Sequence, residues 1–258
     1  MNYIGIDIGS TCAKTAVLNE KKEIIQEFVQ PTGWSSVDTA EEILQKLKLA
    51  GISLSDDSSC CVATGYGRIS VPYADKAVTE ITCHALGAVH LFQQPDLTVI
   101  DIGGQDTKII QIEQGCVKDF IMNDKCAAGT GRFLEVMANT LSLRPNEMFD
   151  LARLGSDTTI SSMCTVFAES EVIGLIGKGE PKENIAYAVV DSTIRKVAAQ
   201  VSRMNGEMST FCLTGGLCEC EYIREALSKK LGKEVISSPD ARYAGAIGAA
   251  LSAMKIRK

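Results

Sequence analysis

Short apolar runs and longer amphipathic stretches alternate along this chain. Residues 3–8 and 97–102 are apolar runs rich in β-branched side chains, which predicts two buried strands. Each run passes through a glycine-containing loop into two more strand-like segments, 14–18 and 23–29 in the first half and 108–112 and 117–121 in the second. The pattern therefore predicts one β-meander in each half of the chain.

Stretches with apolar residues three or four positions apart predict the helices. They cover residues 37–49 and 79–92 in the first half, and 132–141, 166–176, 182–204, 221–231 and 241–255 in the second. The helix over 132–141 is expected to bury Phe133, Leu134, Met137 and Leu141 on one face. Two further strands are expected at 210–214 and 234–237. This alternation predicts an α/β fold, and no linker or low-complexity segment separates the halves.

Composition narrows the class of protein. The chain has 258 residues, a net charge of -6 and a hydrophobic content of 45%, which suits an ordinary globular protein. Lys and Arg do not cluster, so neither nucleic acid nor an anionic membrane is the expected partner. A strand predicted from residue 3 leaves no room for a signal peptide, and the apolar stretch 244–254 is too short to span a bilayer. We therefore expect a cytoplasmic protein.

Ten cysteines are many for a cytoplasmic chain. In a reducing compartment they indicate metal binding, catalysis or simple burial rather than disulfides. With only two histidines, a His-rich metal site is not expected. Cys218 and Cys220 are expected to be a pair of surface thiols, with an accessory metal site as the alternative. Six others are expected to be small core residues: Cys12, Cys60, Cys61, Cys83, Cys116 and Cys212.

The two remaining cysteines each stand close before a predicted helix. Cys126 lies in a turn of small residues and glycines that leads into the helix over 132–141. Cys164 leads into the helix over 166–176, for which Ser162 or Thr165 is the expected N-cap. A thiolate at a helix N-terminus lies in positive potential, so the two cysteines predict something anionic bound between them.

The two apolar runs end in the same pattern, Asp-x-Gly, at Asp7 and at Asp101. Glycines allow a backbone to approach phosphates closely, and carboxylates suit Mg²⁺, mostly through its water ligands. Two ligand-free hairpin turns are the alternative, but a third glycine turn after the strand at 210–214 makes nucleotide binding by two similar lobes the stronger prediction. The chain has no Walker A motif, which excludes a Walker A NTPase, and no strand–G-x-G-x-x-G–helix unit, so a Rossmann dinucleotide site is not expected. The expected hydrogen-bond donors are Ser10, Thr11, Gly104, Gln105 and Thr107.

These motifs together resemble a known superfamily. The duplicated Asp-x-Gly loops and Thr214-Gly215-Gly216 are similar to the phosphate and adenosine motifs of two-lobed actin-like, sugar-kinase-like ATPases, built from duplicated ribonuclease-H-like subdomains. Residues 101–106, 122–134 and 164–171 closely resemble one subfamily within it. It contains the activators (component A) of 2-hydroxyacyl-CoA dehydratases, the BadF-BadG-BcrA-BcrD type ATPases, and ATP-dependent reductases of double-cubane cluster proteins.

The resemblance implies a homodimer that holds one [4Fe–4S] cluster, with Cys126 and Cys164 of each subunit as ligands. Four thiolates suit a cubane, and one chain has two at suitable helix starts. ATP hydrolysis would then drive single electrons from ferredoxin or flavodoxin through the cluster to an iron–sulfur partner enzyme, a dehydratase or a double-cubane protein. The lobes implied are residues 1–94 with the C-terminal helix 241–258, and residues 95–240, which carry the cluster cysteines.

The resemblance also assigns roles to residues in the nucleotide site. Asp7 and Asp101 would organise Mg²⁺, and Gln105 or Asp106 would orient the attacking water, with Asp101 as a further catalytic group. Cys12 departs from the family pattern, in which a small residue is expected. Glu169 and Glu171 either support the cluster ligands or are solvated carboxylates. The residues expected to contact nucleotide are Asp7, Gly9, Ser10, Thr11, Cys12, Lys14, Gly103, Gly104, Gln105, Gly129, Gly215 and Gly216.

Two other functions remain open at the level of sequence. A small-molecule kinase of the sugar-kinase type would share the ATP motifs, but it has no use for Cys126 and Cys164, and the chain leaves little room for a sugar-recognition insertion. A non-redox switch would use the ATP state only to control binding of a partner. Sugar-dependent ATP turnover would favour the kinase, and full function without the two cysteines would favour the switch.

Overall fold

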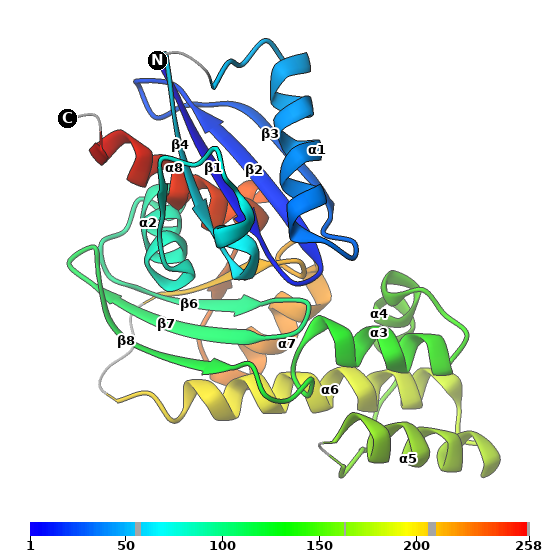
Figure 1. Ribbon diagram of the computed structural model, residues 1–258. Coiled ribbons are helices and arrows are strands. Elements are labelled where there is room, and N and C mark those ends of the chain that lie inside the picture. Colours follow the sequence, from blue (N-terminus) through cyan, green and yellow to red (C-terminus); the bar gives the residue numbers. More distant parts are fainter. Residues whose placement is uncertain (55–57, 163, 206–209, 257–258) are drawn as a thin grey trace. The chain divides into compact units, whose positions relative to one another are not determined.

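The computed structural model describes residues 1–54, 58–162, 164–205 and 210–256 (Figure 1). The chain forms two five-stranded mixed sheets with helices packed on them, so the predicted α/β class is confirmed. It divides into two compact units. The first contains Met1–Leu97, Ile110–Lys118 and Ser238–Lys258, and the second contains Thr98–Ile109 and Asp119–Ser237.

The first sheet has the strand order β3-β2-β1-β4-β5. The predicted meander is present, because β1 pairs antiparallel with β2 and β2 with β3, while β4 is parallel to β1. The strands are β1 (Asn2–Ile8), β2 (Cys12–Leu18), β3 (Ile24–Pro31), β4 (Ser59–Thr64) and β5 (Lys76–Ala77). The helices of this unit are α1 (Ser36–Leu49), α2 (Glu80–Phe92) and α8 (Ala244–Ile256), with 3-10 turns at Tyr66–Ser70 and Pro239–Tyr243.

Strand β1 is buried on both faces because helices cover the sheet on both sides. Ile4 and Ile6 belong to a buried cluster that includes Ile43 of α1. On the opposite face α8 lies directly against the strand, since a Cβ on Gly5 would come within 1.8 Å of the carbonyl oxygen of Ala246. A strand covered on both sides is apolar at most of its positions, which is why the sequence predicted it.

The second sheet repeats the first strand for strand, in the order β8-β7-β6-β9-β10 when read from its meander edge. Its strands are β6 (Leu97–Ile102), β7 (Thr107–Glu113), β8 (Cys116–Asn123), β9 (Thr210–Gly215) and β10 (Val235–Ile236). The helices of this unit are α3 (Gly131–Thr140), α4 (Pro145–Ala152), α5 (Thr165–Gly177), α6 (Lys182–Val201) and α7 (Glu221–Leu231).

Helices α3, α4 and α5 make up the segment between β8 and the long helix α6. Figure 1 shows α3 and α5 beside α6, and both helices contact it. The predicted apolar face of α3 is confirmed, since four side chains are buried: Phe133, Leu134, Met137 and Leu141. Helix α5 is different, because it buries Ala168 and Val172 but exposes larger apolar side chains.

Several local predictions were wrong. Strand β4 and helix α4 were not predicted; β4 is a short buried strand without alternation, and α4 begins at a proline. The last helix begins at Ala244 rather than at residue 241, because a 3-10 turn precedes it. No helix in the described part of the chain is both long and apolar enough to cross a bilayer.

The cysteines are only partly where they were expected. Four are buried as predicted: Cys60, Cys61, Cys83 and Cys212. Cys12 is half-buried, and Cys116 is exposed because it begins β8 just after the hairpin turn. Cys218 is buried and Cys220 half-buried, so they are not a pair of surface thiols.

Candidate functional site

In the first unit the Asp-x-Gly loop connects β1 and β2. Asp7 is 2% exposed near the end of β1. The N–H of Gly9 donates to the carbonyl oxygen of Cys12 at 3.1 Å, which closes the turn, and the Thr32 hydroxyl donates to the carbonyl oxygen of Gly9 at 2.7 Å. Ser10 lies at the half-exposed tip of this turn. Thr11 is exposed and Lys14 is half-exposed. The loop can therefore offer a hydroxyl and an ammonium group as hydrogen-bond donors to a ligand.

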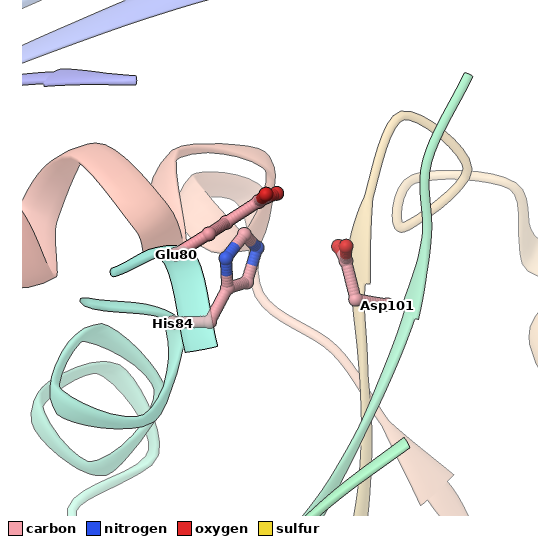
Figure 2. A group of neighbouring side chains, drawn as sticks. All are labelled: Glu80, His84 and Asp101. Carbon is pink, nitrogen blue, oxygen red and sulfur yellow. The ribbon is translucent and has the colours of Figure 1, made fainter. Parts of the chain in front are cut away.

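Backbone packs closely around the carboxylate of Asp7. A Cβ on Gly65, which has φ +82°, would lie 2.5 Å from Oδ1 of Asp7, and a Cβ on Gly245 would lie 2.5 Å from Oδ2. The same Cβ on Gly245 would lie 3.0 Å from Cε1 of His84. His84 and Glu80 extend from successive turns of α2 (Figure 2). Only glycine allows this close approach, so the position of the carboxylate depends on residues far apart in sequence.

In the second unit the equivalent loop connects β6 and β7. The N–H of Gly103 donates to the carbonyl oxygen of Asp106 at 2.9 Å, which closes the same turn. Gln105 is exposed at its tip. The two carbonyl oxygens of the loop are bound by α3: the N–H of Gly131 donates to Gly103 at 2.9 Å, and the N–H of Arg132 donates to Gly104 at 2.8 Å.

A buried ion cluster lies directly behind this second loop. The ammonium of Lys108, a residue that is 1% exposed, lies 2.8 Å from Oδ2 of Asp106 and 3.3 Å from Oδ2 of Asp101. The Thr214 hydroxyl donates to the other oxygen of Asp101 at 2.9 Å. Asp101, drawn in Figure 2, is therefore held by groups from two neighbouring strands. One cation shared by two buried carboxylates satisfies charges that would be costly to leave alone.

Lys108 is a site residue that sequence reasoning missed. A signal was present, because Lys108 follows Asp101 at the same distance as Lys14 follows Asp7. The buried ion cluster also distinguishes Asp106 from Gln105, the two residues expected to orient the attacking water. Asp106 is buried and paired with Lys108, whereas Gln105 is exposed in the loop, so the geometry favours Gln105.

The two glycines expected near the adenosine end β9. Gly215 has φ +82°, and a Cβ there would lie 2.7 Å from Oδ1 of Asp101 and 2.6 Å from the carbonyl oxygen of Ile102. The next residue, Gly216, is exposed. Gly215 therefore packs against Asp101 as Gly65 packs against Asp7, and the sequence pair Thr-Gly occurs at both places.

Cys126 is exposed in the loop between β8 and α3. Its carbonyl oxygen accepts a hydrogen bond from the side-chain amide of Asn123 at 2.8 Å. The N-cap of α3 is Thr130, whose hydroxyl turns back to the carbonyl oxygen of Ala127 at 2.6 Å. Cys126 thus lies in a turn several residues before the helix, as predicted.

Further into this loop, Gly129 is buried and has φ +84°. A Cβ there would lie 2.8 Å from Cγ of Lys196, and its carbonyl oxygen accepts the Thr107 hydroxyl at 2.6 Å. Thr107 is fully buried, so its hydroxyl is committed to Gly129, and the expectation that it donates to phosphate was wrong.

Cys164 is exposed and is itself the N-cap residue of α5, with its carbonyl oxygen accepting the N–H of Ala168 at 2.8 Å. The prediction that Ser162 or Thr165 caps the helix was wrong: Thr165 is the first helical residue, and no side chain caps α5. Met163, part of the same motif, lies outside the described residues. Cys164 therefore lies at the end of the helix where the N–H groups of the first turn lack partners within the helix.

The segment before Cys164 is held by side chains from two helices. The carboxylate of Glu171 accepts from the N–H of Ser161 at 3.0 Å and from the N–H of Ser162 at 3.0 Å. Arg195 of α6 donates to the carbonyl oxygen of Ile160 at 3.0 Å. Burial by itself raises the pKa of Glu171, but the hydrogen bonds from the two serines outweigh it and the net pKa is lowered. Glu171 therefore fixes the segment before Cys164, a role that the sequence alone did not indicate.

Glu169 has a different environment on the same helix. One of its carboxylate oxygens accepts the Thr140 hydroxyl, at the end of α3, at 3.1 Å. This contact joins α3 and α5, the two helices that follow Cys126 and Cys164.

Comparison with known proteins shows the family to which this chain belongs. A model of the BadF/BadG/BcrA/BcrD ATPase family matches residues 4–253. The chain belongs to this family of ATPases. It is 44% identical over 257 residues to the (R)-2-hydroxyglutaryl-CoA dehydratase activating ATPase of Acidaminococcus fermentans, covering 98% of this chain and 96% of that protein.

Solved structures of the family agree with this membership. The crystal structure of A. fermentans (R)-2-hydroxyglutaryl-CoA dehydratase component A matches with a TM-score of 0.91 and 42% identity, over 99% of this chain and 98% of that one. The activator of 2-hydroxyisocaproyl-CoA dehydratase from Clostridium difficile, solved with bound ADPNP, matches with a TM-score of 0.89 and 34% identity, over 99% and 95%. A ROK family glucokinase from Streptomyces griseus, at 17% identity, shares the fold alone. The expected two-lobed fold of actin-like and sugar-kinase-like ATPases is confirmed.

Proposed function

We propose that this member of the BadF/BadG/BcrA/BcrD family is an ATP-dependent activator that delivers single electrons to an iron–sulfur partner enzyme. The electrons would pass through one [4Fe–4S] cluster held by Cys126 and Cys164 of two copies of the chain. The observation that carries the proposal is the exposure of both thiols on loops that enter helices of one unit in a family ATPase. Relatives described as dehydratase activators supply the partner class.

The donor set fits such a cluster. Cluster iron is bound by thiolates, and burial disfavours that charge: it raises the pKa of Cys83 to about 11 and raises those of Cys61 and Cys212 as well. Cys126 and Cys164 do not suffer this burial, and Cys164 has the N-terminus of a 13-residue helix behind it. Cys116 is exposed as well, but it begins a strand. Cys126 and Cys164, the two exposed thiols that precede helices, would supply half of a cubane's four ligands, so two chains are needed.

The surface beside Cys164 supports pairing of two copies. Val166 and Phe167 are each 67% exposed in the first turn of α5, and Ile173 and Ile176 are exposed further along it. A soluble monomer rarely leaves so many large apolar side chains together on one helix. A second copy that shared the cluster would cover them.

We assign the two Asp-x-Gly loops to the nucleotide, in lobes that correspond to residues 1–94 with 241–258 and to residues 95–240. Ser10, Thr11 and Lys14 of the first loop would donate to phosphate oxygens, as would the backbone of residues 103–105 in the second. Gln105 would orient the attacking water. Gly215 and Gly216 would lie against the adenosine. Asp7 would hold Mg²⁺ largely through water, and Asp101 would do so with part of its charge already balanced by Lys108.

When bound, the cluster would supply a one-electron store at low potential, filled by ferredoxin or flavodoxin. The chain would contribute the helix N-terminus at Cys164 and the N–H groups of the loops, all of which favour added negative charge. Binding and hydrolysis of ATP would control when the electron leaves for the partner, a dehydratase or a double-cubane protein.

Iron and acid-labile sulfide should be measured per chain, together with the mass in solution, on protein purified without oxygen. We expect about two irons per chain in a dimer. Cys126→Ser and Cys164→Ser should each lose the iron, whereas Cys116→Ser, which removes another exposed thiol, should retain it. An iron-free wild type with intact ATP turnover would overturn the proposal. Stimulation of that turnover by sugars would then indicate a kinase.

A further inference from the structure

Three hydrogen bonds join the segment 126–132 to the loop at 103–105 and to Thr107, the first residue of β7 after that loop. Two are made by backbone N–H groups at the start of α3, from Gly131 to Gly103 and from Arg132 to Gly104. The third runs from the Thr107 hydroxyl to the carbonyl oxygen of Gly129 at 2.6 Å and is completely buried. Any shift of the loop when it binds phosphate therefore acts directly on the segment 126–132.

The first unit shows that a loop of this kind does not need such bonds. There Ala13 stands at the position of Thr107 and has no hydroxyl, as the matching spacing from Asp7 and from Asp101 shows. The carbonyl oxygen of Gly9 is bound instead by the hydroxyl of Thr32, which directly follows β3. The bond from Thr107 is thus particular to the unit that carries the cysteines.

We propose that Thr107 is a positioning residue that transmits the nucleotide state of loop 103–105 to the Cys126 segment. It acts through Gly129, whose left-handed backbone and contact with Lys196 leave it little freedom to move alone. The segment then has two arrangements, one for each state of the loop. The inference deepens the proposed function, because in that function Cys126 binds the cluster.

Thr107→Val removes the hydroxyl and keeps the shape of the side chain. Thr107→Ser keeps the hydroxyl, and Thr107→Ala copies the first unit should the valine variant fold poorly. Thr193→Val is the matched control, since Thr193 is 1% exposed and its hydroxyl has no hydrogen-bond partner within the described part of the chain.

The first readout is the rate at which a chelator removes iron from anaerobic dimer, with Mg²⁺ and either ADP or ADPNP. In the wild type we expect the two nucleotides to give rates that differ by about fivefold or more, the lower range of coupling between sites. Thr107→Val and Thr107→Ala should keep the iron and lose the difference, whereas Thr107→Ser and Thr193→Val should keep both. A difference retained in the valine and alanine variants, or lost in Thr193→Val, would overturn the inference.

The second readout does not need the cluster. Amide hydrogen exchange at Thr130, whose N–H donates to the carbonyl oxygen of Ala127 at 3.0 Å within the Cys126 segment, should respond to ADPNP in the wild type and in Thr107→Ser, and should not respond in Thr107→Val. Iron-free protein that shows this pattern would refute the cluster and uphold the role of Thr107. Wild-type amides that do not respond to the nucleotide would refute the role of Thr107 whatever the iron content.

Discussion

The two Asp-x-Gly loops lie in sheets with the same strand order. Each loop is closed by a backbone hydrogen bond, and a glycine packs against the aspartate of each, but the groups around the two loops differ. In the first, Cys12 follows the tip and Lys14 is half-exposed. In the second, Asp106 occupies the position of Cys12, and Lys108 is drawn into the interior between two carboxylates. One exchanged residue, aspartate for cysteine, thus accompanies the change of a lysine from the surface to the core.

The two loops have the same turn but different attachments. The first loop is held within its own meander by Thr32, whereas the second is held by α3 and by Thr107. A second loop that is hydrogen-bonded to the Cys126 segment suits transmission of a signal. A first loop with a half-exposed lysine suits capture of phosphate.

The greatest difference in stability is expected between replacement of Lys108 and replacement of Lys14. Lys108→Met leaves Asp101 and Asp106 buried without their cation, so it should destabilise the protein by about 3–5 kcal/mol. Lys14→Met, at the equivalent position, should cost less than about 1 kcal/mol. Urea unfolding of both variants measures the difference, and equal costs would contradict the contrast between the loops.

The second prediction concerns the glycine that packs against the aspartate in each unit, Gly65 against Asp7 and Gly215 against Asp101. Gly65→Ala and Gly215→Ala each force a Cβ to within 2.6 Å or less of a backbone oxygen, at a φ of +82°. Each should destabilise the protein by about 2–4 kcal/mol. Thermal unfolding should show similar losses for both variants. Gly51→Ala is the control, because its φ is also positive but no atom lies within 4 Å of the added Cβ, so only the backbone strain remains.

A smaller effect concerns the chemistry at the two loop tips. Gln105→Ala should lower ATP turnover by about 10²-fold, because orientation of water is lost, and change the Kd of the nucleotide by less than about threefold. Thr11→Ala, at the equivalent position, should weaken binding and leave the turnover at saturation nearly unchanged. Steady-state kinetics with direct binding measurements decide the point, and the reverse pattern would exchange the roles of the two loops.

The smallest expected change in stability concerns Glu171, which holds the segment before Cys164. The hydrogen bonds from Ser161 and Ser162 lower the net pKa of Glu171 below 4.5 in spite of its burial. Its stabilising contribution is therefore complete above pH 4.5 and is lost as the pH falls through the lower folded pKa. Glu171→Gln should cost about 1 kcal/mol or less at pH 7, and the cost should shrink toward zero in acid. Urea unfolding at a series of pH values measures it, and a constant difference between variant and wild type would refute the role of ionised Glu171.

The meanders and most helices were predictable because their cause is local. Buried strands such as β1 and β6 are apolar at most positions, apart from Asp7 and Asp101 near their ends, and α3 shows its buried face at helical spacing. Strand β4 and helix α4 were missed because a six-residue buried strand and an eight-residue helix leave too little period to detect. The caps were misassigned because Ser162 has an alternative partner, Glu171, that only folding brings near.

The two similar loops, the class of fold and the two cysteines that differ from the other eight could all be recognised from the order of residues along the chain. These features follow from spacing along the chain, which a local pattern records. The tertiary structure decided that Lys108 is buried, that Asp106 is an ion-pair partner and that Thr107 binds Gly129. Those outcomes depend on which groups share the interior, where an unpaired polar group is costly, and that is settled only when distant segments pack together.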